Sequence, residues 1–340
     1  MHIPKNVLIY TTILCLFLAF AQAQQTGTKK SQIETYLLNA NQNGLFNGNV
    51  LVIENGEILF RKSIGFADAS KQVPLTPEYR FHIGSIAKEF DAVGVMMLVE
   101  QSKLSLDDKL ATFFPDLPEW SKLISVRNLL QYTSGLPEIK YQTVHNDADN
   151  WKDLMTLRQL DFAPGSQYAY NNNNTFLRRK LIEKVSGVSF KEFAEQTMLK
   201  KVGIKNGIAD PTDADPLMAK SFNNDFKQDK LQAPISGWTC VNLDDLYKWS
   251  ESINAFTLIS PKSTKFILTP FMPDKQAGLG KGTMENERVL THIHDGAALR
   301  YQALLMVDNS KRRTIILLTN QKHDNVYDLG NGITAILDKP

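Results

Sequence analysis

Two pairs of apolar runs, one near each end of the 340-residue chain, limit the folds that the sequence can adopt. Near the N-terminus, Asn49–Ile53 and Glu57–Arg61 flank Glu54-Asn55-Gly56, and Asn-Gly between short apolar runs is a strong signal for a β-hairpin. Near the C-terminus, Gln302–Val307 and Thr314–Thr319 are also apolar. Strands at both ends, with helices beside them, predict an α/β (α+β) fold with one antiparallel sheet formed by N- and C-terminal strands.

The middle of the chain has a different pattern. Its apolar spacing indicates short helices and loops, with helices at 126–131, 151–160, 175–185 and 190–199. Helices are also expected over 31–42, 243–254 and from about Tyr327. We therefore expect an α/β part, about 31–106 and 234–340, that is interrupted by an all-helical insert at about 107–233.

The N-terminus has the pattern of a signal peptide. A modest positive start precedes a nearly all-apolar run from Val7 to Ala21, and Ala21-Gln22-Ala23 is a small-x-small cleavage site. Residues 1–23 are thus expected to be removed, leaving one domain over 24–340 in the periplasm or outside the cell, without a stable membrane span. The alternative is a retained anchor, although the run is shorter than the roughly 20 residues of a spanning helix.

Charge and cysteine content exclude several classes of function. The chain has 38 basic and 36 acidic residues, a formal charge of +2, and no basic run long enough to suggest a nucleic-acid partner. After cleavage the chain would hold one cysteine, Cys240, which cannot form an intramolecular disulfide. The sequence therefore predicts a globular domain without structural disulfides.

Ser85-Ile86-Ala87-Lys88 carries the strongest chemical signal. A helix is expected to begin just after His82-Ile83-Gly84, and residues three apart in a helix share a face, so Lys88 should lie beside Ser85. A helix N-terminus favours a developing negative charge, and the amine supplies a base for a weak nucleophile. The pattern alone is weak, because a Ser-x-x-Lys is expected about once by chance in such a chain and Ser85 could be a simple helix cap.

Three further segments follow in an order that is typical of a known family. After Phe81–Lys88 (FHIGSIAK) come Leu129–Pro137 (LLQYTSGLP), Pro164–Asn172 (PGSQYAYNN) with a Tyr-x-Asn motif, and His294-Asp295-Gly296 before a strong strand. The chain thus resembles the serine β-lactamase and penicillin-recognising hydrolases, particularly the class C branch with its D-alanyl-D-alanine peptidases and esterases. The resemblance spans nearly all of the mature chain and implies a β-lactamase/transpeptidase-like fold.

The resemblance implies a catalytic role for three residues. Ser85 would attack an acyl carbonyl, and Lys88 would take up or hand on its proton, which requires burial or a positive neighbour to lower the lysine pKa. A Tyr170 phenolate held by Lys88 would accept the serine proton and pass it to the leaving group. Tyr168 competes for this role, but only Tyr170 has its asparagine two positions later in the segment.

The resemblance also implies substrate-binding groups. The Asn172 side chain would bind the acyl side chain, although it lies in a run of four asparagines that could be a polar turn. The backbone N–H groups of Ser85 and Ala297 would form the oxyanion hole, beside Gly296 of the third motif. No cofactor is implied, and the expected partner is a small-molecule or peptide substrate.

The third motif departs from that of many β-lactamases, which carry lysine where this chain has His294. Histidine is mostly neutral near pH 7 and would attract a substrate carboxylate less strongly than an ammonium does. The resemblance therefore favours a D-alanyl peptidase or esterase with weak β-lactam turnover. Asp295 at the middle position could raise the histidine pKa or repel an anionic substrate.

Two other classes of function compete with the prediction of a serine hydrolase. His292 and His294 are two apart in a strand and share a face, so with His323 and Asp324 they superficially resemble the ligands of a metal hydrolase. A non-catalytic sensor or binding protein could keep the same fold. The substrate stays open among a peptidoglycan peptide, a β-lactam and an ester.

Overall fold

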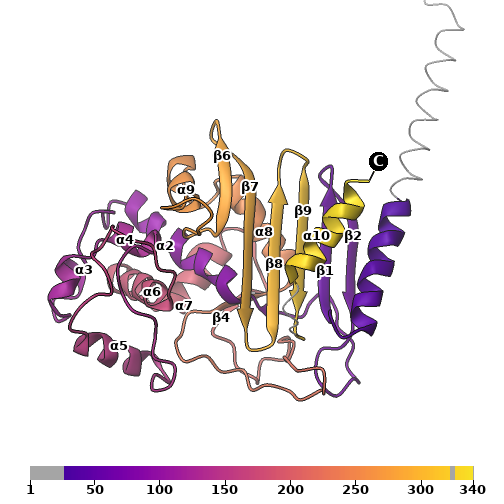
Figure 1. The fold of residues 1–340 in the computed structure, drawn as a ribbon, viewed down its shortest axis with the longest axis horizontal. Helices are drawn as coiled ribbons and strands as arrows, with labels where there is room; N and C mark the ends of the chain where they lie inside the picture. The colour runs from indigo at the N-terminus through magenta and orange to yellow at the C-terminus, as the bar shows by residue number, and fades with distance from the viewer. Residues whose placement is uncertain (1–26, 322–325, 340) are drawn as a thin grey trace, which may run out of the picture.

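The computed structural model describes residues 27–321 and 326–339, so the expected signal peptide at 1–23 lies outside the described residues. In the described part of the chain, six antiparallel strands form the main sheet in the order β2-β1-β9-β8-β7-β6 (Figure 1). These strands are β1 (Gly48–Glu54), β2 (Glu57–Ile64), β6 (Lys281–Glu285), β7 (Arg288–Ala298), β8 (Tyr301–Asp308) and β9 (Arg313–Thr319).

The sheet joins the two ends of the chain, as the sequence predicted. β1 pairs with β2 through a turn at Asn55 and Gly56, whose φ angles are 57° and 82°. A two-residue hairpin turn needs such positive φ values, which Gly adopts freely and Asn adopts at low cost. On its other side β1 pairs with β9, from Gly48 opposite Thr319 to Ile53 opposite Thr314. The prediction of an antiparallel sheet from N- and C-terminal strands is confirmed.

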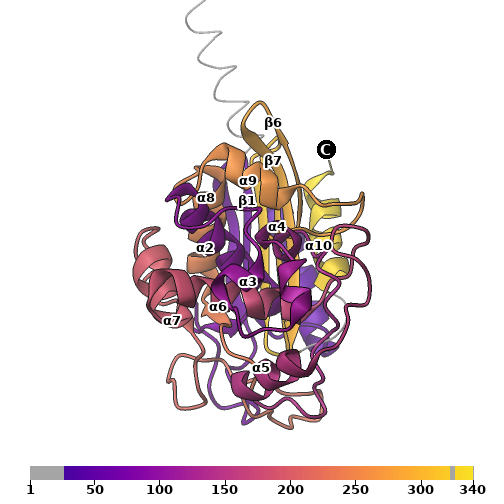
Figure 2. The same cartoon turned by 90° about the vertical axis from the view of Figure 1, so that its left-hand side faces the viewer.

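Helices cover both faces of this sheet (Figures 1 and 2). Because side chains alternate along a strand, Val50 and Val52 belong to the core on one face and Leu51 and Ile53 to the core on the other. A helix over 27–42 and α10 pack on the first face, and α2 and α8 pack on the second. The bounds are α2 (Lys88–Glu100), α8 (Leu243–Asn254), α9 (Pro261–Leu268) and α10 (Val326–Leu337).

A group of helices lies beyond α2, away from the sheet (Figure 1). It contains α3 (Leu110–Phe113), η2 (Glu119–Lys122), α4 (Val126–Leu130), α5 (Asp147–Thr156), α6 (Asn172–Ser186), α7 (Phe190–Glu192) and η3 (Phe193–Leu199). Side chains of α2 and α6 share one core, so α2 lies between the sheet and these helices. The domain boundaries predicted at 106/107 and 233/234 stay a prediction.

Several elements differ from the sequence expectations. The helix expected at 151–160 is α5, which begins at Asp147 because the Asn146 side chain caps it by accepting from the Asp149 N–H. The helix expected at 190–199 divides into α7 and the π-helical turn η3. A small sheet of β3 (Phe81–His82), β5 (Thr239–Val241) and β4 (Ile208–Ala209) was not predicted, because strands of two or three residues show no periodicity.

Helix α2 is buried more completely than predicted. Its apolar spacing predicted one face toward the core, but every residue from Lys88 to Leu98 is buried, three charged side chains included. A helix that is enclosed on all sides must find a partner for each charge it carries. This requirement concentrates ion pairs and hydrogen bonds around the start of α2.

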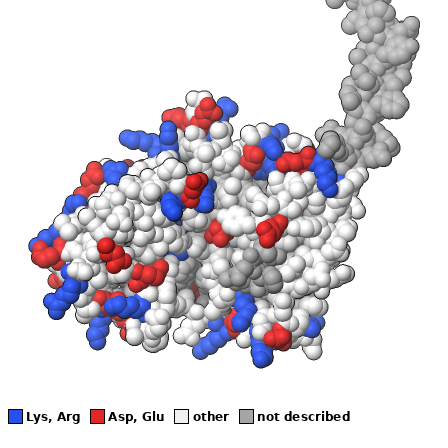
Figure 3. All heavy atoms as spheres, in the orientation of Figure 1, with Lys and Arg blue, Asp and Glu red and all other residues white. Residues whose placement is uncertain are grey.

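The described residues include no helix that is both long enough and apolar enough to cross a membrane. On the face of the molecule shown in Figure 3, basic and acidic side chains lie interspersed, without a large area of one sign. A surface of this kind gives little long-range steering of a charged partner to that face.

Candidate active site

Ser85 lies in a tight turn directly before α2. Gly84–Ala87 forms the 3₁₀ turn η1, and α2 begins at Lys88, so the regular helix starts three residues later than predicted. Gly84 has a φ of 55°, which favours glycine. His82 Nδ1 accepts from the Gly84 N–H at 3.0 Å, and burial lowers the pKa of His82 to about 4, so this ring stays a neutral acceptor.

Three functional groups meet at Ser85, as the resemblance implied. Lys88 Nζ donates to Ser85 Oγ at 2.8 Å and to the Tyr170 hydroxyl at 2.7 Å. The Tyr170 hydroxyl donates in turn to Ser85 Oγ at 2.8 Å. The side chain of Tyr168 lies apart from this triangle, where its hydroxyl accepts from the Gln276 N–H at 3.3 Å. Between the two tyrosines, the geometry therefore favours Tyr170.

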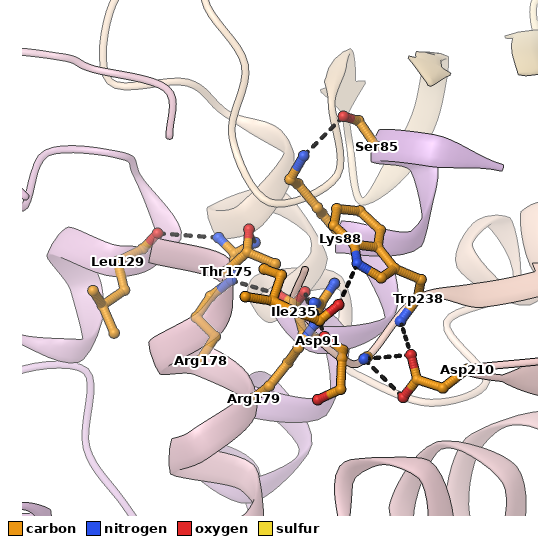
Figure 4. Close-up of polar contacts among 12 residues, drawn as sticks. Ser85, Lys88, Asp91, Leu129, Thr175, Arg178, Arg179, Asp210, Ile235 and Trp238 are labelled. Atoms are coloured by element: carbon orange, nitrogen blue, oxygen red, sulfur yellow. Dashed lines mark hydrogen bonds and ion pairs between the residues drawn. The ribbon is translucent and has the colours of Figure 1, made fainter. Parts of the chain in front are cut away.

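Lys88 is prepared to act as a base. Only 2% of its surface is exposed, and burial together with the nearby Arg179 guanidinium lowers its pKa to about 7. Trp238 lies over the amine, 5.3 Å from the ring centroid (Figure 4). A lysine with this pKa carries a free lone pair in a large fraction of molecules at neutral pH, which an exposed lysine does not.

A buried cluster of charges sets the field around Lys88. Asp91, one turn further along α2, forms ion pairs with Arg178 and Arg179 of α6, and all three side chains are buried (Figure 4). Arg178 also donates to the Leu129 carbonyl at 3.0 Å, and Arg179 donates to the Ser236 carbonyl. The Arg179 guanidinium lowers the pKa of Lys88 more than the Asp91 carboxylate raises it, so this cluster disfavours a proton on Lys88.

Tyr170 holds its proton more tightly than an ordinary tyrosine. Burial of its hydroxyl and the nearby Tyr132 raise its pKa well above the usual value, although 36% of the side chain is exposed. With the Lys88 pKa lowered and the Tyr170 pKa raised, the free site at neutral pH holds a neutral phenol beside an amine that is neutral in a large fraction of molecules. This arrangement differs from the expected phenolate held by an ammonium, and it makes Lys88 the stronger candidate for the base.

The backbone of β7 touches the turn that carries Ser85. A Cβ on Gly296 would lie 2.0 Å from the Ile83 carbonyl oxygen and 2.5 Å from Ser85 N, and a Cβ on Gly84 would lie 2.2 Å from Ala297 N. Only two facing glycines allow such an approach. It brings the backbones of Ser85 and Ala297 close together, and the role of their two N–H groups as an oxyanion hole stays a prediction.

A cavity of about 430 Å³ opens in front of Ser85. Tyr168, Tyr170, Gly296 and Ala297 line it, together with four charged side chains of the described chain: Asp274, Lys275, Lys281 and Asp295. Asp295 accepts from the Tyr327 hydroxyl at 3.0 Å. Polar and charged walls of both signs suit a substrate with polar groups around the scissile bond better than a purely apolar ester.

Asn172 is engaged by a neighbouring loop. Its Nδ2 donates to the Tyr141 hydroxyl at 2.5 Å, and its backbone N–H donates to both oxygens of Glu138, at 3.1 and 3.2 Å. Its Oδ1 is buried without a hydrogen-bond partner. The contact with an acyl side chain stays a prediction, and Tyr141 occupies the amide that would make it.

His294 does not line the cavity that contains Ser85. It is 2% exposed, and its Nδ1 lies 2.7 Å from Glu89 Oε1, while His292 Nε2 lies 2.8 Å from the same oxygen. The two histidines share a face of β7, as expected for a strand, but they meet one carboxylate of α2. In the described part of the chain no group of three or more His, Cys, Asp or Glu is arranged as a metal site, and His323 and Asp324 lie outside the described residues.

Sequence reasoning missed Glu89, Arg179 and Trp238. A signal for the first two was present, because Lys88-Glu89-Phe90-Asp91 and Arg178-Arg179 place charges inside otherwise apolar helices. Charges on buried helices must be paired, so each of these side chains needed a buried partner. Arg178 and Arg179 meet Asp91, whereas Glu89 meets His292 and His294. Nothing in the sequence indicated that Trp238 would cover Lys88.

Comparisons with known proteins agree with this geometry. A sequence model of the Beta-lactamase family matches residues 29–337. Penicillin-binding protein 4* of Bacillus subtilis (strain 168) is 25% identical over 338 residues, 88% of this chain and 74% of that protein. Teichoic acid D-alanine hydrolase of Staphylococcus aureus (strain MRSA252) is 32% identical over 164 residues, 48% of this chain and 40% of that protein, so the chain matches less than half of that relative.

The fold is also similar to solved structures. The penicillin-binding protein from Bacillus halodurans superposes with a TM-score of 0.77 at 22% identity, over 89% of this chain and 98% of that chain. Sequence match, superposition and the Ser85–Lys88–Tyr170 geometry agree on the β-lactamase/transpeptidase-like fold implied by the sequence motifs. The chain belongs to the beta-lactamase family of serine hydrolases.

Proposed function

We propose that the protein is a serine hydrolase that cleaves an amide or ester through an acyl-enzyme on Ser85. The observation that carries this proposal is the triangle of hydrogen bonds among Ser85 Oγ, Lys88 Nζ and the Tyr170 hydroxyl, all at 2.7–2.8 Å. Nucleophile and base within hydrogen-bond reach, with a third group that orients them, are the parts that covalent catalysis by serine requires.

In the acylation step, neutral Lys88 takes the Ser85 proton as Oγ bonds to the substrate carbonyl carbon. The negative charge moves to the carbonyl oxygen, which the N–H groups of Ser85 and Ala297 stabilise. The proton then passes from Lys88 through the Tyr170 hydroxyl to the leaving nitrogen or oxygen as its bond to the carbonyl carbon breaks. In deacylation the oxygen of a water molecule bonds to the acyl carbon and the Oγ–carbon bond breaks. The water proton passes through Tyr170 and Lys88 to Ser85 Oγ, and the carboxylic acid leaves.

For the substrate, we propose a D-alanyl peptide or a D-alanyl ester, with weak turnover of β-lactams. The names of two relatives, a penicillin-binding protein and a teichoic acid D-alanine hydrolase, support this class. The third motif supports it as well, because the lysine typical of many β-lactamases is replaced by the buried His294. The cavity in front of Ser85 offers Lys275 and Lys281 for a carboxylate and Asp274 and Asp295 for an amine.

A substrate panel with intact-protein mass spectrometry tests both the serine mechanism and the proposed substrate class. D-alanyl esters, D-alanyl-D-alanine peptides, one penicillin and an activated ester are each incubated with the wild type and with Ser85→Ala. We expect a mass increase on the wild type that matches the acyl group, and none on Ser85→Ala. Turnover that survives in folded Ser85→Ala would reject Ser85 as the nucleophile.

The panel also separates the competing functions. A stable adduct without release of product from any substrate would favour the non-catalytic sensor. Loss of turnover with a chelator would favour a metal hydrolase. Turnover of the penicillin at a rate above that of every D-alanyl substrate would overturn the proposed substrate class while leaving the serine mechanism in place.

A further inference from the structure

Glu89 is a buried carboxylate near the site with hydrogen-bond partners on both oxygens, and the mechanism above does not use it. It directly follows Lys88 in α2, and its side chain is fully buried. Oε1 lies 2.8 Å from His292 Nε2 and 2.7 Å from His294 Nδ1, and Oε2 accepts from Trp249 Nε1 at 2.7 Å. One side chain of α2 thus joins two residues of β7 and one of α8.

The two histidines connect Glu89 to the oxyanion hole. His292, His294 and Gly296 alternate along β7 and face α2 and η1. Gly296 lies about 7 Å beyond His294, since an antiparallel strand rises about 3.4 Å per residue. At that point the backbone of β7 touches the turn of Ser85, with the Gly296 Cβ position 2.5 Å from Ser85 N. A shift of the histidines would therefore move Ala297 relative to Ser85.

The charge of this cluster argues for a function beyond packing. A buried ion pair rarely stabilises a fold more than apolar side chains of the same volume, but it fixes geometry through directed hydrogen bonds. Burial alone would raise the pKa of Glu89, yet His292 and His294 together hold it well below its usual range. Burial would lower the pKa of His292, but the Glu89 carboxylate raises it above its ordinary value.

We propose that Glu89 is a positioning residue for catalysis. Through His292 and His294 it holds β7 against the start of α2 and thereby sets the spacing between the N–H groups of Ala297 and Ser85. The inference rests on the proposed function, in which these two groups form the oxyanion hole. Glu89, His292 and His294 form a buried clamp between α2 and β7. The proposal assigns His294 to this clamp, in place of the contact with a substrate carboxylate that the family resemblance implied.

The clamp also has a consequence for pH dependence. His292 contacts the Glu89 carboxylate from α2, and the Leu279 carbonyl from the loop before β6 also favours its proton. The same carboxylate binds His294 from the same strand and the Trp249 indole from α8. Glu89 is the only anion among these. Loss of the His292 proton at high pH removes its charge-assisted attraction to the Glu89 carboxylate, so the clamp should weaken above the raised pKa of His292.

The test measures labelling of Ser85 by a fluorophosphonate, which needs the base and the oxyanion hole but no particular substrate. In this reaction the Oγ–P bond forms, the P–F bond breaks, fluoride leaves and the serine proton passes to Lys88. The rate constant at saturation and the half-saturating concentration are measured from pH 5 to 10 by intact mass, for the wild type, Glu89→Gln and Glu100→Gln. Glu100 is the matched control, because it also lies on α2 and accepts from the Ser260 N–H, before α9, at 2.8 Å.

For Glu89→Gln we expect the saturating rate to fall at least about 10-fold, with less than about a two-fold change in half-saturation, because oxyanion donors act in the transition state. The alkaline limb of the pH profile of its labelling rate should move to lower pH, since His292 loses the carboxylate that favours its proton. The acid limb, which Lys88 sets, should stay in place. Glu100→Gln should keep both limbs and the rate.

A Glu89→Gln protein that melts earlier but labels like the wild type, with the same alkaline limb, would overturn the proposal. Should this variant fail to fold, His292→Gln is measured instead. Its saturating rate should fall in the same way, because it breaks the same clamp from β7, and the alkaline limb that His292 sets should be absent. Failure of the hydrolase proposal is distinguishable, because a wild type that turns over no substrate still reports its labelling rate.

Discussion

At the scale of single residues, the site depends on two pKa shifts of opposite sign. Lys88 is brought to a pKa of about 7 by burial and by Arg179, whereas burial raises the pKa of Tyr170 far above its usual value. In the proposed mechanism the lysine lone pair therefore accepts the Ser85 proton, and the phenol relays it. In that mechanism neither residue completes the proton transfer to the leaving group without the other.

This interdependence predicts non-additive losses. Lys88→Ala and Tyr170→Phe should each lower turnover of an activated ester strongly, by at least about 100-fold. The double variant should lose little more than the worse single variant, because groups that act as a unit cannot be lost twice. Rates for all four proteins, at equal amounts of folded protein, decide the matter. Losses that multiply would show that the two residues act independently.

The buried Lys88 should also cost stability in a pH-dependent way. Its pKa is about 7 in the folded protein and about 10.4 in an unfolded chain. Between these values the unfolded chain binds one more proton, so this group's contribution to the free energy of unfolding rises as pH increases from 7 to 10. Lys88→Met, which has no charge, should therefore be more stable than the wild type at pH 7, and the difference should shrink toward pH 10.

Urea unfolding of both proteins at pH 6, 7, 8.5 and 10 measures this difference. Contributions of other ionisable groups cancel in the comparison, because the two chains differ only at Lys88. A stability difference that stays constant across this range would mean that the lysine keeps an ordinary pKa in the folded state, and the assignment of Lys88 as the base would fail with it.

At the scale of elements, the proposed oxyanion hole depends on the close contact between β7 and η1. A Cβ on Gly296 would lie 2.0 Å from the Ile83 carbonyl oxygen, so Gly296→Ala must push the strand away from the turn. We expect labelling of Ser85 and hydrolysis to fall about 100-fold, the usual cost of losing one oxyanion donor. The measurement is the labelling rate at saturating fluorophosphonate.

Gly187→Ala is the matched control for this variant. Gly187 ends α6 with a φ of 79° and has open space where its Cβ would be. Alanine there should cost about 1 kcal/mol of stability through backbone strain, without an effect on the rate. Equal rate losses in the two alanine variants would indicate general destabilisation, in place of a displaced strand.

How far elements could be predicted depended on whether their signal is local. The hairpin at Asn55-Gly56, the strands β8 and β9, and the helices α4, α6, α8 and α10 carry apolar periodicity or turn residues within their own segments. The strands β3, β4 and β5 do not, because two or three residues acquire strand geometry only from the partners that tertiary packing brings.

The same distinction applies to the site. Ser85, Lys88 and Tyr170 could be predicted because each lies in a motif with a recognisable context. The burial of His294 could not, because it depends on Glu89, which is more than 200 positions away in the sequence. In the sequence, neither His294 in the third motif nor Glu89 in an apolar helix indicates its partner. Only the packing of β7 on α2 brings the two side chains together.

At the scale of the whole molecule, cleavage of the expected signal segment distinguishes an exported, processed protein from one that is retained at the membrane. The apolar run ending in Ala21-Gln22-Ala23 predicts that the exported protein begins at Gln24. N-terminal sequencing of protein recovered from the periplasm or the medium measures this directly. An intact Met1 on membrane-bound protein would indicate the retained anchor. A variant with Ala23→Pro should accumulate uncleaved, because a small residue is needed at the cleavage site.

Asp91 forms buried ion pairs with Arg178 and Arg179, and these pairs join α2 to α6 of the helical group. The same residues should therefore affect both the stability of the protein and the pKa of Lys88. Asp91→Asn leaves two buried guanidinium groups without their anion, which should cost about 3–5 kcal/mol. Burial and Arg179 already lower the pKa of Lys88, and Asp91 is the largest opposing influence. Its removal should lower the lysine pKa further.

Two measurements on Asp91→Asn follow, both at low temperature so that the variant stays folded. Urea unfolding should show the large stability loss, and the acid limb of the Ser85 labelling rate should move to lower pH than in the wild type. Asp244→Asn is the control, because the Arg61–Asp244 pair is exposed and should contribute within about 1 kcal/mol. A group that sets the pKa of Lys88 cannot be removed without moving the acid limb of the labelling rate. If Asp91→Asn loses stability but keeps the wild-type acid limb, the cluster joins α2 to α6 without tuning the pKa of Lys88.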